Sequence, residues 1–321
     1  ISDDLKNCQI SVDIKSCHYS VISSINKKSN TRADVSLDRI EAITTKNEKS
    51  YYGTYALKTS SVFYSYMPEL ACLSLLKNNQ NIINCRDFCY KHYFDAFTAE
   101  ETVPKLSLCL DYADCTLESF IKMSLLKSSK VISIIIKDLI MGLKACHDNN
   151  IIHRDLKLDN VMFVDGHFVL IDFDNSVTFS SFRKSLDPKL ASPILFRAPE
   201  ALYESIHYDY KIDIWALGHL FYFIIEKEHL FKDSDCTNDV LNAMFSLFGF
   251  PCDGDWPEAY DLPFWKDWDN TKIKYKNYFN EPFFRGKLGK YYDLVMSCFV
   301  MNPKKRANTA QLLELLEKVK L

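Results

Sequence analysis

Residues 153–160 read His153-Arg154-Asp155-Leu156-Lys157-Leu158-Asp159-Asn160. A run of apolar residues with helical spacing precedes this stretch at 132–143, and a strand-like run follows it at 161–163. We therefore expect a loop that holds an acid, a base and an amide close together. A further carboxylate, Asp172, follows the apolar run 168–171, twelve residues after Asn160.

These polar residues are suited to phosphoryl transfer. Asp155 can accept the proton of an attacking hydroxyl group, and Lys157 can neutralise the moving phosphoryl group. Asn160 and Asp172 offer the hard oxygen ligands that Mg²⁺ prefers. The alternative is turn chemistry, because aspartate and asparagine are common in loops. We favour the catalytic interpretation, because no other common reaction uses all four residues.

Further motifs accompany this loop along the chain. They are Tyr55-Ala56-Leu57-Lys58, Ala198-Pro199-Glu200, Asp213-Ile214-Trp215-Ala216-Leu217-Gly218 and Asn302-Pro303-Lys304-Lys305-Arg306. Together they resemble the eukaryotic protein kinases, whose catalytic loop has the pattern His-Arg-Asp-Leu-x-x-x-Asn. The resemblance covers residues 33 to 321, and the loop alone is a specific signal.

The resemblance implies a nucleotide site formed by Lys58, Glu69, Asp111 and Ala113. Lys58 would hold the α- and β-phosphates of ATP, and Glu69 would be its ion-pair partner on a helix. The implied cofactors are ATP and Mg²⁺. Two structural contacts are implied as well: a buried ion pair between Glu200 and Arg306, and a brace from Asp213 to the catalytic loop.

The implied fold is α+β and bilobal, with a small β-rich lobe at 33–113 and a larger helical lobe at 114–321. Local patterns agree, because short strand-like runs dominate before residue 112 and helical periods dominate after residue 117. Residues 1–32 are polar and show no clear period. We expect them to form an N-terminal extension.

Length and composition narrow the class of protein and the partners to expect. The chain has 321 residues, of which 47% are hydrophobic, and a net charge of -3. These values predict a folded protein without the overall positive field that would attract nucleic acid or an anionic membrane. The longest apolar stretch, 131–143, is too short to span a bilayer. Since no secretory signal is visible, we read the 11 cysteines as reduced thiols of a cytoplasmic or nuclear protein.

The expected phosphate-binding loop lacks its glycines. Counting back from Lys58 places the three loop glycines of the family near Ser36, Asp38 and Glu41. Side chains there block the close approach of backbone amides to phosphates. Carboxylates also repel phosphates, by about 4 kcal/mol for two unit charges at about 4 Å and an effective dielectric constant of about 20. We therefore expect weak ATP binding.

Three further positions depart from the family pattern. Asp174 replaces a glycine, and it either tolerates a left-handed backbone or adds a second carboxylate beside Mg²⁺. Pro193 stands where serine/threonine kinases usually carry threonine, but Lys157 lies nearer to the chemistry and favours Ser/Thr specificity. Asp187 stands where an activating phosphothreonine is expected. We hypothesise that Asp187 pairs permanently with Arg154.

Residues 195–200, 245–251, 255–257 and 262–263 resemble the cyclin-dependent branch of the family. Proline is favoured only in the first turn of a helix, so the helix with Glu69 should begin near Pro68. Such a start would remove the turn that a cyclin grips, which argues against a cyclin partner. We expect a protein substrate and allow for another regulatory protein, with no nucleic acid and no membrane.

Two functions follow from these observations. The first is a protein kinase that transfers the γ-phosphate of ATP to Ser/Thr hydroxyls of proteins. The second is a pseudokinase that acts as a scaffold or regulator with weak or no ATP binding. A third, tyrosine phosphorylation, rests on Pro193 alone.

Overall fold

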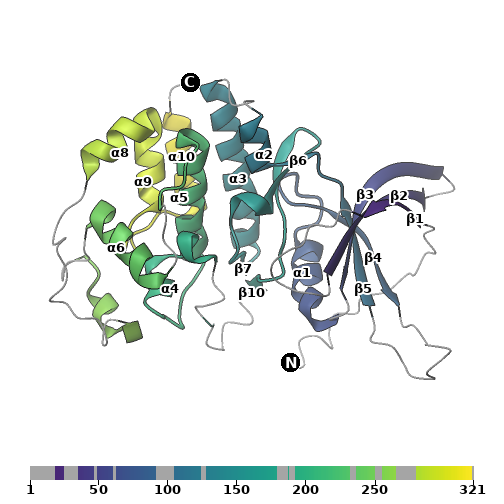
Figure 1. Cartoon of the computed structure of the whole chain (residues 1–321), viewed down its shortest axis with the longest axis horizontal. Helices are drawn as coiled ribbons and strands as arrows, with labels where there is room; N and C mark the ends of the chain where they lie inside the picture. The colour runs from purple at the N-terminus through teal and green to yellow at the C-terminus, as the bar shows by residue number, and fades with distance from the viewer. Residues whose placement is uncertain are drawn as a thin grey trace. The chain divides into compact units, whose positions relative to one another are not determined.

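The computed structural model divides the chain into two compact units (Figure 1). The first is drawn from Ile1–Phe63 and Cys85–Tyr112, and the second from Tyr64–Asn84 and Ala113–Leu321. The structure describes residues 19–24, 35–46, 49–60, 63–91, 105–123, 128–178, 187, 192–231, 236–249, 255–264 and 280–319. Strands dominate the first unit and helices the second, so the predicted α+β class is confirmed.

The first unit contains a five-stranded antiparallel sheet. In spatial order its strands are β1 (Tyr19–Ser24), β2 (Val35–Lys46), β3 (Lys49–Ser60), β5 (Lys105–Asp111) and β4 (Cys85–Lys91). Leu106, Leu108 and Leu110 share one face of β5 and are all buried, and Cys109 on the other face is buried too, with Tyr55 and Leu57 packed against it. The strand register places Lys58 of β3 between Leu37 and Leu108.

The strand register also corrects two sequence predictions. Tyr19–Ser24 forms β1 and pairs with β2, although the sequence analysis assigns residues 1–32 to an extension. Ser36, Asp38 and Glu41 lie within β2 and pair with β3, whereas the connection between β1 and β2 falls at 25–34. That connection lies outside the described residues. Counting back from Lys58 fails because β2 and β3 form a hairpin of two strands of 12 residues each.

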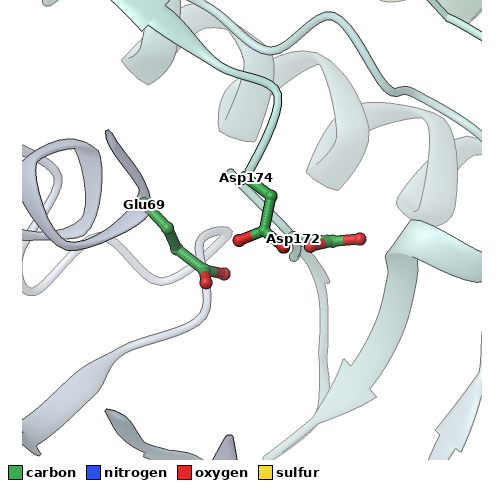
Figure 2. A group of neighbouring side chains, drawn as sticks. All are labelled: Glu69, Asp172 and Asp174. Carbon is green, nitrogen blue, oxygen red and sulfur yellow. The ribbon is translucent and has the colours of Figure 1, made fainter. Parts of the chain in front are cut away.

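Helix α1 (Phe63–Leu75) contains Pro68 in its interior. The prediction that the helix begins near Pro68 is therefore wrong, and so is the argument against a cyclin that rests on it. Proline removes one backbone hydrogen bond and costs about 3 kcal/mol in a helix interior. Pro68 itself is exposed, whereas Glu69, Leu70 and Leu73 on the same helix are buried. Their burial offsets the proline, and Glu69 extends toward Asp172 and Asp174 (Figure 2).

The second unit is mainly helical. Besides α1 its helices are α2 (Leu117–Lys122), α3 (Ser129–Asp148), α4 (Pro199–Leu202), α5 (Lys211–Glu226), α6 (Thr237–Phe248), α8 (Glu281–Leu288), α9 (Tyr292–Cys298) and α10 (Thr309–Lys318). Short strands β6 (Cys115–Thr116), β8 (Val161–Val164) and β9 (His167–Leu170) form one sheet, and β7 (Ile151–Ile152) pairs with β10 (Val177–Thr178). A capping box of Asn308 and Gln311 starts α10. Among the described residues, no helix is both long and apolar enough to cross a membrane.

Helix α5 forms the centre of the second unit. It is buried from Lys211 to Ile224, and it contacts α9, α8 and α3. Trp215 packs edge to face against Phe248 and Phe299 at centroid distances of 5.6 and 5.2 Å. His219 lies in the same aromatic group, and within the described part of the chain its Nε2 has no hydrogen-bond partner. Burial lowers the pKa of His219 to about 3, so the imidazole is neutral in the folded protein.

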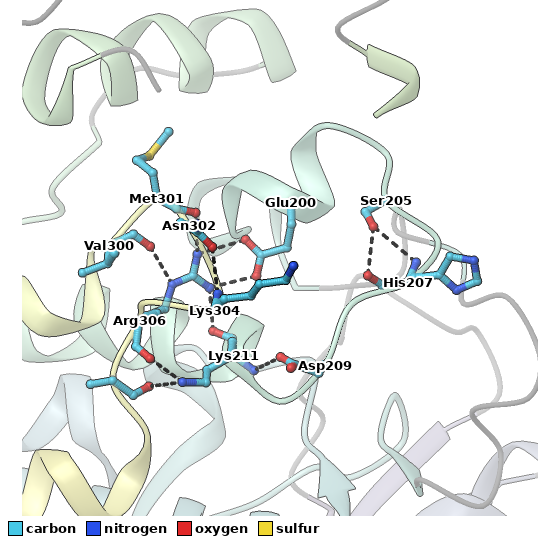
Figure 3. Close-up of polar contacts among 11 residues, drawn as sticks. Glu200, Ser205, His207, Asp209, Lys211, Val300, Met301, Asn302, Lys304 and Arg306 are labelled. Carbon is cyan, nitrogen blue, oxygen red and sulfur yellow. Dashed lines mark hydrogen bonds and ion pairs between the residues drawn. The ribbon is translucent and has the colours of Figure 1, made fainter. Parts of the chain in front are cut away.

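The predicted ion pair between Glu200 and Arg306 is confirmed (Figure 3). The two terminal guanidinium nitrogens of Arg306, Nη1 and Nη2, donate to the two carboxylate oxygens of Glu200 at 2.8 and 2.9 Å. Arg306 also donates to the carbonyl oxygens of Val300 and Met301, and to that of Lys211 at the start of α5. A buried guanidinium needs this full set of acceptors, because its desolvation is costly. The contacts therefore tie α4, the start of α5 and residues 300–306 together.

Replacing Arg306 by methionine should destabilise the second unit, because it leaves the buried carboxylate of Glu200 without its partner. We expect the free energy of unfolding to fall by about 3–5 kcal/mol, measured by urea unfolding with tryptophan fluorescence. Lys304→Met is the control, since Lys304 and its partner Glu258 are exposed. The control should leave the unfolding midpoint unchanged. Equal midpoints for Arg306→Met and the wild type would contradict the role of the ion pair.

The buried His219 should make stability depend on pH. Its pKa is lowered from 6.5 to about 3, so below the ordinary value the unfolded chain binds a proton that the folded chain does not. The free energy of unfolding should therefore be unaffected by His219 above about pH 6.5, and it should fall as the pH decreases below that value. Between about pH 7.5 and pH 5 the wild type should lose about 2 kcal/mol more than His219→Phe. The measurement is urea unfolding across pH, with exposed His207→Gln as control; a loss in His219→Phe equal to that of the wild type refutes it.

Candidate active site

Asp213 braces the candidate catalytic loop, as predicted. This fully buried carboxylate accepts hydrogen bonds from the backbone N–H groups of His153 and Arg154, both at 2.9 Å. Arg154 has a φ of 66°, in the left-handed region that most residues avoid. Two charge-assisted bonds to one carboxylate compensate such strain. His147, which the sequence analysis did not single out, adds a third contact to Asp213 at 3.1 Å.

The imidazole of His153 joins the loop to the segment that carries Asp172. Its Nε2 lies 3.1 Å from the carbonyl oxygen of Ile171, and the backbone N–H of Asp155 points to its Nδ1 at 3.3 Å. These two contacts assign the hydrogen to Nε2, because Nδ1 acts as the acceptor. The backbone N–H of Ile171 also donates to the carbonyl of Asn160 at 3.0 Å. The residues before Asp172 are thus held on both sides by the loop.

Asp155, Lys157 and Asn160 meet around one carboxylate oxygen. Oδ2 of Asp155 accepts from Nζ of Lys157 at 2.8 Å and from Nδ2 of Asn160 at 2.9 Å. Nδ2 of Asn160 also donates to the backbone carbonyl of Asp155 at 2.8 Å. Asp155 and Asn160 are both buried, whereas Lys157 is partly exposed. Within the part of the chain that the structure describes, no hydrogen bond to the other carboxylate oxygen of Asp155 is formed.

Glu69, Asp172 and Asp174 bring three carboxylates together (Figure 2). One oxygen from each lies within 4.8 Å of the others. The backbone N–H of Phe173 donates to Oε1 of Glu69 at 3.4 Å, and the Phe173 ring packs on His153 at 4.7 Å. Of the two options for Asp174, the structure favours the second carboxylate, because the left-handed residue is Asp172, with a φ of 65°.

The oxygens of this acidic group fit a hard divalent cation. Like charges so close together are unfavourable without a cation or protons to neutralise them. Carboxylate and amide oxygens are the ligands that Mg²⁺ and Ca²⁺ take in proteins. Because Nδ2 of Asn160 is engaged by Asp155, its Oδ1 is the atom available to a metal. Asn160 and Asp172 are therefore retained as metal-ligand candidates, and Asp174 joins them.

The nucleotide candidates are divided between the two units. Lys58 lies on β3 and Asp111 ends β5 in the first unit, whereas Glu69 and Ala113 belong to the second. Arg86 forms a two-pronged ion pair with the carboxylate of Asp111. The Asp111 side chain is thus engaged within its own sheet. The pairing of Lys58 with Glu69 stays a prediction.

Arg154 contacts the segment that would contain an activating phosphothreonine. Its Nη2 donates to the backbone carbonyl of Asp187 at 3.3 Å, so the observed contact involves the main chain rather than the carboxylate that we hypothesised. Ser192 donates to the carbonyl of Arg154, and Arg197 donates to the carbonyl of Ser192. The sequence analysis missed the roles of Ser192 and Arg197. For Arg197 a signal was available, since it directly precedes the Ala198-Pro199-Glu200 motif.

Comparison with known proteins identifies the family. The family described as protein kinase domain matches residues 44–315. Cyclin-dependent kinase 11 of Dictyostelium discoideum is 32% identical over 184 residues, which cover 57% of this chain and 50% of that protein. Cyclin-dependent kinase 7 of the same organism is 26% identical over 307 residues, which cover 92% of this chain and 75% of that protein. This chain therefore spans about half of the first relative's length.

The fold of this chain also has a counterpart among solved structures. A chain of the CAK complex from Chaetomium thermophilum, bound to ATP-γ-S, aligns with a TM-score of 0.74 at 21% identity. The alignment covers 92% of this chain and 89% of that one. The match of 44–315 spans most of the sequence and includes the loop, its brace and the buried ion pair described above. The chain therefore belongs to the eukaryotic protein kinase family, as a divergent member similar to the cyclin-dependent kinases.

Proposed function

We propose that this chain transfers the γ-phosphate of ATP to serine or threonine hydroxyls of protein substrates. One observation carries the proposal: Lys157 and Asn160 hold the same carboxylate oxygen of Asp155. A carboxylate fixed in this way presents its second oxygen in a defined direction. General-base catalysis requires such positioning of the group that accepts the proton.

In the proposed reaction, Asp155 accepts the proton of the substrate hydroxyl group while the oxygen of that hydroxyl group attacks the γ-phosphorus. The bond from this phosphorus to the bridging oxygen breaks, and ADP leaves with the electron pair. Lys157 is close enough to Asp155, at 2.8 Å, to offset negative charge on the transferred group. Mg²⁺ on Asn160 and Asp172 would neutralise the phosphates. The chemistry is mainly positioning and charge stabilisation, which fits the hydrogen-bonded loop.

For ATP, we propose contacts by Lys58 to the phosphates, by Glu69 to Lys58, and by Asp111 and Ala113 at the base. The argument for weak binding changes with the strand register. Asp38 and Glu41 lie in β2, so their repulsion of phosphates loses its basis. The connection 25–34 still contains no glycine, but its sequence includes two lysines and an arginine. These cations favour phosphate binding by charge, whereas the lost glycines oppose close backbone contacts.

The proposed acceptor class rests on Lys157, which contacts the base directly, whereas Pro193 lies outside the loop. For partners we propose a protein substrate and a regulatory protein. Since α1 begins at Phe63, Pro68 no longer argues against a cyclin. Relatives of this chain are named cyclin-dependent kinases, which supports a cyclin-type protein as the regulator to test.

The second candidate function is a pseudokinase that binds other proteins without phosphoryl transfer. The sequence of 25–34 favours it, because this connection has no glycine for close contact with phosphates. The complete set of Asp155, Lys157, Asn160 and Asp172 favours the enzyme. The two functions differ in two measurable properties, namely phosphoryl transfer and binding of Mg·ATP.

Asp155→Asn should reduce phosphoryl transfer by about 10²–10⁴-fold, because an amide cannot accept the proton. The assay follows labelled phosphate on generic protein substrates, with analysis of the modified amino acid. Asp159→Asn is the matched control, because Asp159 lies in the same loop but is exposed. It should retain wild-type turnover. Transfer by Asp155→Asn at the wild-type rate would exclude this mechanism, and phosphotyrosine as product would revive the tyrosine alternative.

Mg·ATP should stabilise the wild type against heat, by about 2.7 kcal/mol at a concentration a hundredfold above Kd. Lys58→Met should lose most of this shift, because the ammonium group that holds the phosphates is gone. Lys122→Met, at an exposed helical ion pair, should keep it. The measurement is a thermal shift with and without Mg·ATP. A wild type that shows neither a shift nor transfer above Asp155→Asn would establish the pseudokinase.

A further inference from the structure

Arg39 places a positive charge on the same face of the first unit's sheet as Lys58. Strands β2, β3 and β5 are neighbours in this sheet (Figure 1), and residues that pair across antiparallel strands share a face. Arg39 of β2 pairs with Ala56, which pairs in turn with Leu110. Lys58, two residues after Ala56, pairs with Leu108 on the same face of β5. One face of the sheet therefore carries both Arg39 and the proposed phosphate contact Lys58.

The guanidinium group of Arg39 extends away from Lys58. Its carbon lies 4.8 Å from the centroid of the Tyr112 ring, and Tyr112 directly follows Asp111 at the end of β5. Lys58 pairs with Leu108, four residues before Tyr112 along the chain. At about 3.4 Å per residue of antiparallel strand, this separation is about 14 Å. The guanidinium therefore lies at the end of the sheet where Asp111 is a proposed contact of the base.

The Nε atom of Arg39 is buried, and among the described residues it has no hydrogen-bond partner. A buried donor without an acceptor is unfavourable, so an arginine with a purely structural role is expected to bond at this atom. Arg306 does so, because its Nε donates to the carbonyl oxygen of Val300 at 2.9 Å. The side chain of Arg39 is instead partly exposed and lies over the Tyr112 ring. A ligand explains this position better than a hydrogen bond of the fold does.

We propose that Arg39 is a specificity-determining residue whose guanidinium group stacks on the base of the nucleotide. The proposal rests on the proposed function and names a further contact in the same site. A purine base is flat and aromatic, and guanidinium groups bind such rings by cation–π attraction and stacking. The Tyr112 ring positions the guanidinium near Asp111 and leaves the phosphates to Lys58. Part of the nucleotide affinity of this chain should therefore depend on the base and on Arg39.

The test measures the affinity of the full chain for adenosine, Mg·ATP and inorganic triphosphate with Mg²⁺ by isothermal titration calorimetry. Arg39→Leu keeps an apolar contact but removes the charge and the planar group. It should weaken the binding of adenosine and Mg·ATP alike, by about 3- to 30-fold, the range of a cation–π contact. The affinity for triphosphate should stay within about twofold of the wild type. In the transfer assay the KM for ATP should rise by the same factor with kcat unchanged, because a contact with the base is equal in the ground state and the transition state.

Arg285→Leu is the matched control. The guanidinium carbon of Arg285 also lies over a tyrosine, 4.1 Å from the ring centroid of Tyr292, but this exposed pair belongs to the second unit. The control should match the wild type for all three ligands. Arg39→Gln keeps a planar polar group without the charge, and it replaces Arg39→Leu if urea unfolding shows that the leucine variant does not fold. Arg39→Gln should weaken adenosine and Mg·ATP in the same range.

Binding of adenosine by the folded Arg39 variant with wild-type affinity would overturn the proposal. Tighter binding would do so as well, because it would mean that Arg39 obstructs the base, and so would weakened triphosphate binding with adenosine unchanged. A wild type that binds Mg·ATP no better than triphosphate also contradicts a contact with the base. If the wild type binds adenosine and Mg·ATP but transfers no phosphate, the proposed kinase function fails. The comparison of affinities then still decides the role of Arg39.

Discussion

The carboxylate of Asp213 accepts hydrogen bonds from two successive backbone amides, those of His153 and Arg154, and the geometry of the candidate active site depends on this contact. Asp213 lies in the first turn of α5, where the partial positive charge of a helix N-terminus stabilises an anion. Full burial strengthens both bonds, because no water competes for the carboxylate. The left-handed backbone of Arg154 is thereby maintained, and Asp155 follows it.

The same helix start connects this loop to the end of the chain. Arg306 donates to the carbonyl of Lys211, two residues before Asp213, while it pairs with Glu200. Beyond the loop, Arg154 in turn donates to the carbonyl of Asp187. Two buried arginines thus use carbonyl oxygens to join segments that are far apart in the sequence. Such contacts are directional, so they transmit position as well as stability.

The residues of the candidate active site could be predicted from the sequence, because they belong to short motifs. The loop 153–160 is a local motif, whereas the brace from Asp213 and the pair of Glu200 with Arg306 were implied by the resemblance to the protein kinases, and the structure shows these contacts. Strand register could not be predicted in this way. The position of β1 and the length of the β2–β3 hairpin are set by pairing between distant residues. Counting back from Lys58 therefore predicted a loop at Ser36, Asp38 and Glu41, which lie in β2.

The predicted start of helix α1 was wrong for a related reason. Local propensity places Pro68 at a helix start, but burial of Glu69, Leu70 and Leu73 decides where the helix extends. The sequence pattern also left two roles open for Asp174. Only the backbone shows that Asp172 takes the left-handed conformation while Asp174 contributes its carboxylate to the acidic group.

Asp174 also affects which small molecules this chain can accommodate. Phe173 is fully buried against His153, and the residue after it lacks the backbone freedom of glycine. An inhibitor that displaces Phe173 must offset the free energy lost when this aromatic side chain becomes exposed, about 1.5–3 kcal/mol. It must also rotate the backbone of a residue with a narrow range of φ. Compounds that leave this phenylalanine in its pocket avoid both costs, so screening should select for that binding mode.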